Sequence, residues 1–246
     1  MLRESFQSPI SPVLVASMVV VVFLSVFVWA WAVRRPTPVQ NHQMERLPIT
    51  YAAIGASDVE GVGASDPAGE NWASLLHSRM PQGTRFMRLG RGGITLHEAN
   101  ALEVPQAVAS KPDIVTIWNC VNDALGGVSL DRYTQDLNTA LTRLTRETRA
   151  YVFLLNLPDI SLIMQANAEQ RALARGGVQQ WNQAIDATAA SYKDRVTVVD
   201  LYPASAEVLD HPEYLSPDNF HPSTAGYKRL ADIVWEAIER ERALER

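Results

Sequence analysis

The chain lacks several features that would point directly to a function. Its 246 residues include one cysteine, Cys120, which excludes an intramolecular disulfide and any metal site built from several cysteines. The net charge is −5, and no clustered basic face is evident, so we do not expect a nucleic-acid partner. No internal repeat or low-complexity tract is present. Hydrophobic residues make up 47% of the chain, which is enough for one sizeable core.

The N-terminal region contains a long run without charge. Residues 13–33 carry no ionisable side chain, and a helix of this length, at about 1.5 Å per residue, spans the hydrocarbon layer of a membrane. We expect a single-pass anchor here. A cleaved signal peptide stays open as an alternative, because Ala30-Trp31-Ala32 fits a small-x-small cleavage site. The expected divisions are a tail over 1–12, the anchor over 13–33, a proline-containing linker over 34–48 and one globular domain over 49–246.

The globular part alternates short apolar runs with helical patterns. The runs are rich in β-branched and aromatic residues and are too short for buried helices, so they predict strands. These strand candidates are Ile49–Ile54, Arg85–Leu89, Asp113–Trp118, Tyr151–Asn156 and Val196–Leu201. Five strands that alternate with helices predict a three-layer α/β/α sandwich around a parallel sheet.

Apolar residues at helical spacing predict three long helices. Their stripes comprise Leu130, Tyr133, Leu137, Leu141 and Leu144; Val178, Trp181, Ile185 and Ala189; and Tyr227, Leu230, Val234 and Ile238. Ser129 is the expected N-cap of the first of these helices. Two shorter helices are expected over Asn71–Arg79 and Thr95–Leu102. The Ala- and Gln-rich stretch Ser161–Gly177 is either a lid or an additional helix.

Polar residues follow the predicted strands at the edge where parallel sheets carry their sites. Ser57 follows the first strand, Gly93 the second and Asn122 the third. Asp218 and His221 lie in the loop that leads into the last helix. Each residue alone has an ordinary explanation as a cap or turn residue. Their convergence on one edge predicts a site.

These residue types suit nucleophilic catalysis. A serine hydroxyl is a weak nucleophile and needs a base within hydrogen-bond reach. His221 is the candidate base for Ser57, and Asp218 is the candidate group that orients the imidazole. Two neighbouring residues receive simpler interpretations: Asp58 is expected to cap the turn that follows it, and Cys120 is a weak alternative nucleophile without a paired base.

Serine, glycine, asparagine and histidine in this order resemble the SGNH hydrolases, also called the GDSL esterase and lipase family. The first motif reads Gly55-Ala56-Ser57-Asp58 where the family often has Gly-Asp-Ser, and the resemblance covers roughly residues 49–240. It implies a flavodoxin-like α/β fold and ester hydrolysis through an acyl-serine. It also implies that the oxyanion is bound by the backbone N–H groups of Ser57 and Gly93 and by the amide of Asn122.

The resemblance further implies a small-molecule or lipid ester substrate and no metal or cofactor. Lipid esters, thioesters and O-acetylated carbohydrates remain alternatives, as do acyl transfer on the same site and a catalytically silent glycan- or lipid-binding module. The oligomeric state is left open. Two indications of the membrane orientation of the domain disagree. Arg34-Arg35 favours a cytoplasmic domain by the positive-inside rule, whereas anchored family members usually work outside. We expect a single-pass membrane protein with an extracytoplasmic catalytic domain.

Overall fold

The structure is a computed structural model that describes residues 48–245. Within this part of the chain, no helix is both long and apolar enough to cross a membrane. The segment expected to form an anchor, residues 13–33, lies outside the described residues.

A five-stranded parallel sheet forms the centre of the domain, as the sequence predicts. The strands lie in the order β2-β1-β3-β4-β5, and every neighbouring pair is parallel. Their ends differ from the expected ones by no more than two residues. The bounds are β1 Thr50–Gly55, β2 Arg85–Gly90, β3 Ile114–Ile117, β4 Tyr151–Leu155 and β5 Val196–Val199. All residues of β1, β3 and β4 are buried, because helices cover both faces of these central strands.

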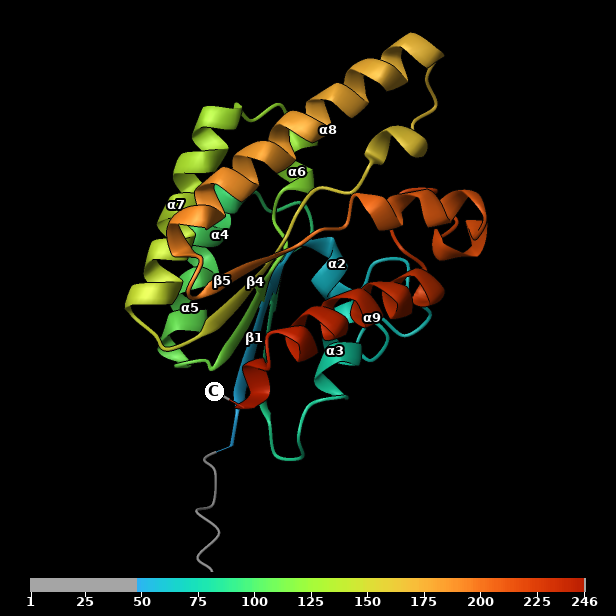
Figure 1. Cartoon of the computed structure of the whole chain (residues 1–246). Helices are drawn as coiled ribbons and strands as arrows, with labels where there is room; N and C mark the ends of the chain where they lie inside the picture. The colour runs from blue at the N-terminus through green and yellow to red at the C-terminus, as the bar shows by residue number, and fades with distance from the viewer. Residues whose placement is uncertain (1–47, 246) are drawn as a thin grey trace, which may run out of the picture. The chain divides into compact units, whose positions relative to one another are not determined.

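Helices pack on both faces of the sheet and confirm the three layers (Figure 1). One face carries α3 (Trp72–His77) and α9 (Thr224–Arg240), and the other carries α4 (Leu96–Leu102), α5 (Val104–Ala109), α7 (Leu130–Arg146) and α8 (Ala168–Ala189). The predicted cap at the start of α7 is confirmed, since the side chain of Ser129 accepts a hydrogen bond from the Arg132 N–H. From Ala168 onward, the stretch interpreted as a lid or a helix belongs to α8.

Several short elements, most of them near strand ends, were not predicted from the sequence. The helices α2 (Ser57–Glu60) and α6 (Val121–Leu125) begin just after β1 and β3, and each carries a candidate site residue. The remaining elements are 3₁₀ helices: η1 Ile160–Leu162, η2 Ala190–Tyr192, η3 Pro203–Leu209, η4 Pro212–Tyr214 and η5 Ala243–Glu245. Such short elements leave no periodic pattern long enough to recognise.

The start of α9 is tied to the loop that follows α2. Tyr227 donates a hydrogen bond from its hydroxyl to the Val62 carbonyl, over 2.7 Å. The Ser65 N–H donates to Thr224 Oγ1 over 2.9 Å. These contacts hold the beginning of the last helix, and therefore the loop before it, beside the carboxyl end of β1.

Candidate active site

Ser57, His221 and Asp218 form a hydrogen-bonded chain. Ser57 is the first residue of α2, directly beyond β1. Its Oγ lies 3.0 Å from His221 Nε2, and His221 Nδ1 lies 2.7 Å from Asp218 Oδ2. The structure therefore brings together the three residues that were singled out in the sequence, and their catalytic roles stay a prediction.

Asp218 is held as a carboxylate by a set of donors. Its Oδ1 accepts hydrogen bonds from Ser216 Oγ and from the N–H groups of Phe220 and His221, over 2.7 to 2.9 Å. Desolvation alone would raise the pKa of Asp218, but these bonds and the one from His221 lower it below its usual range. An ionised Asp218 accepts from Nδ1–H, which leaves Nε2 to accept the Ser57 hydroxyl proton. Ser216 was not identified from the sequence, where a serine two residues before an aspartate carries no signal.

The glycine-rich loop after β2 passes beside the nucleophile candidate. A Cβ atom added to Gly92 would lie 4.0 Å from Ser57 Cβ. Gly93 has φ +76, and no heavy atom lies within 4 Å of the position of an added Cβ. Neither the Ser57 N–H nor the Gly93 N–H donates a hydrogen bond to a residue of the described chain. Both are therefore free to bind an anion.

Asn122 lines the same pocket as Ser57 and His221. Its Nδ2 donates to the Ile94 carbonyl over 3.0 Å, which fixes the amide and leaves its second hydrogen for another acceptor. The neighbouring Asp123 is buried and accepts from the Leu96 N–H over 2.9 Å, so it ties α6 to the start of α4. Burial raises the pKa of Asp123 to about 6.

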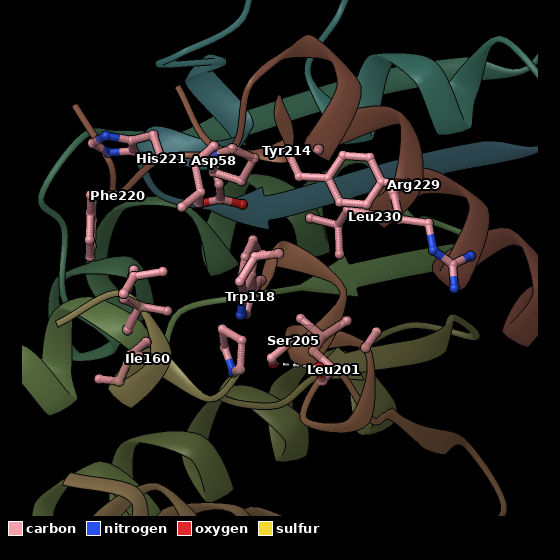
Figure 2. Close-up of a pocket in the computed structure, with 18 of the residues that line it drawn as sticks. Asp58, Trp118, Ile160, Leu201, Ser205, Tyr214, Phe220, His221, Arg229 and Leu230 are labelled. Atoms are coloured by element: carbon pink, nitrogen blue, oxygen red, sulfur yellow. Dashed lines mark hydrogen bonds between the residues drawn. The ribbon is translucent and has the colours of Figure 1, made fainter. Parts of the chain in front are cut away.

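A largely apolar pocket opens beside the Ser57–His221 pair. Its volume is about 190 Å³. Figure 2 shows His221 and Phe220 toward one end of the pocket, Arg229 toward the other and Trp118 between them. Further apolar lining comes from η1 and the residue after it, from η3 and the loop before it, and from α9. These residues are Ile160, Ile163, Leu201, Ala204, Val208, Leu230 and Ile233. The sequence did not reveal this pocket, because its wall is assembled from several irregular segments.

The structure shows the surroundings of Asp58 and Cys120, the two residues near Ser57 and Asn122 that received simpler interpretations. Asp58 does not cap the turn that follows it: its Oδ1 accepts from the preceding Ala56 N–H and its Oδ2 accepts from Trp72 Nε1, both over 2.7 Å. Burial raises its pKa to about 6, against the opposing effect of these bonds. Cys120 is fully buried, and burial raises the pKa of its thiol far above the usual range, so it is not a thiolate nucleophile.

Comparison with protein families yields a match over most of the domain. The model of the GDSL-like lipase/acylhydrolase family matches residues 53–229, a span that contains all five candidate residues. Among curated proteins, none matches the chain significantly.

Solved structures share the fold at low sequence identity. The crystal structure of TesA is similar with a TM-score of 0.61 and 23% identity, over 78% of this chain and 98% of TesA. The lipase Lip_vut3 from a goat rumen metagenome has a TM-score of 0.63 and 22% identity, over 77% of this chain and 97% of its own. A catalytic mutant of Axe2, an acetylxylan esterase from Geobacillus stearothermophilus, has a TM-score of 0.62 and 20% identity, over 77% and 94%.

The hydrogen-bonded chain generates a first prediction. Ser57→Ala and His221→Ala should each lower kcat for ester hydrolysis by roughly 10⁴-fold or more, and the double variant should be little worse, because the residues act as a unit. Asp218→Asn should cost less than His221→Ala.

Steady-state kinetics and labelling with a fluorophosphonate probe measure this prediction. The probe should modify Ser57, and circular dichroism should show that each variant is folded. Labelling at a different serine, or full activity of Ser57→Ala, would refute the assignment of the nucleophile.

Asn122 generates a second prediction. Asn122→Ala should lower kcat by roughly 10²–10³-fold with little change in KM, because a bond to the oxyanion forms only in the transition state. Steady-state kinetics separate the two constants. A change confined to KM would instead assign Asn122 to ground-state binding.

Proposed function

The chain belongs to the GDSL-like lipase/acylhydrolase family, and we propose that it hydrolyses esters that carry an aliphatic chain, through an acyl intermediate on Ser57. It is a serine hydrolase of the GDSL/SGNH type acting on ester bonds. The observation that supports the aliphatic chain is the apolar pocket beside Ser57 and His221.

The proposed reaction uses the groups that meet at the edge of the sheet. Ser57 Oγ attacks the ester carbonyl carbon while His221 Nε2 accepts its proton, and the Ser57–carbon bond forms. The oxyanion accepts hydrogen bonds from the N–H groups of Ser57 and Gly93 and from the amide of Asn122. His221 then gives the proton to the alcohol oxygen as the carbon–oxygen bond breaks. Water, deprotonated by His221, hydrolyses the acyl-serine and restores Ser57.

The pocket favours a hydrocarbon chain over an acetylated sugar. Burying one methylene group contributes about 0.8 kcal/mol, so each methylene that enters an apolar pocket raises binding by roughly fourfold. A sugar would place hydroxyl groups against apolar side chains such as Ile163 and Val208, where they would lose their hydrogen bonds to water. An acetyl group would leave most of the pocket empty.

A third prediction tests the chain-binding role of the pocket. With p-nitrophenyl acetate, butanoate, octanoate and dodecanoate, kcat/KM should rise with chain length by about 10-fold or more before it levels off. Ala204→Leu, which places a larger side chain in the pocket wall, should lower kcat/KM for octanoate by about 10-fold and leave acetate nearly unchanged.

Ala206→Leu provides the matched control, because Ala206 lies in the same 3₁₀ helix but is exposed and outside the pocket lining. It should hydrolyse every ester as the wild type does. A preference for acetate in the wild type, or equal effects of Ala204→Leu on acetate and octanoate, would contradict the proposal.

We also propose that residues 13–33 anchor the enzyme in a membrane with the catalytic domain outside the cytoplasm. The uncharged run supports the anchor. The orientation is supported only by the resemblance to SGNH hydrolases, whose anchored members usually work outside.

A fourth prediction tests this arrangement. The full chain should remain with membranes during carbonate extraction, whereas a truncated chain beginning at Met44 should be soluble and active. Protease added to intact cells should remove the catalytic domain. A mature N-terminus at Val33 would identify a cleaved signal peptide instead, and protection from protease would identify a cytoplasmic domain.

A further inference from the structure

Asp58, the residue that follows the proposed nucleophile, is buried, with 8% of its surface exposed. Each of its carboxylate oxygens accepts a hydrogen bond over 2.7 Å: Oδ1 from the Ala56 N–H and Oδ2 from the indole Nε1–H of Trp72. No salt bridge involves Asp58 in the part of the chain that the structure describes. Burying a carboxylate costs free energy, which hydrogen bonds must offset, and here the bonds come from neutral donors alone.

The first of these bonds acts on the residue just before Ser57. Ala56 has φ −124 and ψ −133, which lies outside the main α and β regions. The ψ angle of Ala56 sets the plane of the peptide bond between Ala56 and Ser57. It therefore sets the direction of the Ser57 N–H, one of the free donors, and the position of the Ser57 side chain opposite His221.

The second bond ties the carboxylate to a rigid part of the core. Trp72 is fully buried at the start of α3, and its ring packs edge to face against Trp118, with centroids 6.5 Å apart. Trp118 in turn donates from Nε1 to the Asn156 carbonyl over 3.1 Å. The indole N–H of Trp72 therefore has a fixed position, and it fixes the carboxylate of Asp58.

We propose that Asp58 and Trp72 are positioning residues for the nucleophile: the indole of Trp72 fixes the Asp58 carboxylate, and that carboxylate holds Ala56 in the conformation that aims the Ser57 hydroxyl and N–H. The proposal rests on the proposed role of Ser57. It concerns the geometry of the turn rather than contact with the reacting atoms.

Asparagine at position 58 can keep only one of the two hydrogen bonds that Asp58 accepts. Its single carbonyl oxygen can accept from Ala56 or from Trp72, and its NH₂ group then faces the other N–H. Asp58→Asn should lower kcat for p-nitrophenyl butanoate by about 10²-fold, with KM nearly unchanged, because small misplacements of reacting groups cost this much. Trp72→Phe alone removes one donor, keeps the Ala56 bond and should lower kcat less than Asp58→Asn does.

The double variant Asp58→Asn/Trp72→Phe provides the decisive measurement. Without the indole N–H, the asparagine oxygen is free to turn toward Ala56, so kcat should recover by about 10-fold relative to Asp58→Asn, although two core substitutions would otherwise add their losses. The kcat of Asp58→Ala/Trp72→Phe should not exceed that of Asp58→Ala, because alanine offers no acceptor to the Ala56 N–H. Asp136→Asn is the control for loss of a buried carboxylate, since Asp136 is 7% exposed on α7 and outside the pocket. It should keep the wild-type kcat.

All rates are measured well below each melting temperature, with the labelling rate of Ser57 by the fluorophosphonate probe as a second readout. The inference is overturned if Asp58→Asn keeps kcat within twofold of the wild type, or if the double variant is no faster than Asp58→Asn. An absence of Ser57 labelling in the wild type would instead refute the proposed function, which makes the two failures distinguishable.

Discussion

The hydrogen bond between Ser57 and His221 is the contact on which the site depends. It joins residues 164 positions apart, one beyond the first strand and one before the last helix. The contact forms because α3 and α9 pack on the same face of the sheet and because Tyr227 and Thr224 bind the loop after α2. The position of His221 therefore depends on helix packing and on hydrogen bonds at the start of α9.

The loop that carries His221 is ordered by its own backbone. Asn219 adopts φ 57, and Leu215 pairs with Pro222 in an isolated antiparallel bridge. The loop also packs closely against its surroundings: an added Cβ at Gly63 would lie 2.4 Å from the Pro222 carbonyl oxygen. Such contacts fix the loop that carries His221, and the hydrogen bond between Nδ1 and Asp218 fixes the orientation of its imidazole.

The sequence was sufficient for the elements that leave a periodic pattern. All five strands, the helices α7 and α9 and the second half of α8 were predicted, because strands buried on both faces are continuous apolar runs and helices buried on one face carry apolar residues at helical spacing. The first half of α8 was left open between a lid and a helix. Ser57 was a candidate because it follows the end of the first strand, whereas Asp218 and His221 were candidates because a carboxylate stands three residues before a histidine in the loop that leads into the last helix. Two features were not predictable from the sequence: the pair of hydrogen bonds that Asp58 accepts, and the part of the pocket wall that η1 and η3 form. Both depend on how segments without a repeating pattern pack in three dimensions.

Residues that line the pocket also contact the proposed catalytic groups. Phe220 lines the pocket and packs edge to face against the ring of His221, with centroids 4.9 Å apart. A chain that fills the pocket therefore contacts a side chain that itself supports the base. Asp58, Ser57 and Asn122 line the same pocket. Under the proposed function, a substrate bound there excludes water from the position where the oxyanion forms and strengthens the hydrogen bonds made to it. In the proposed reaction, binding energy from a part of the substrate remote from the ester thus contributes to the rate of the chemical step as well as to affinity.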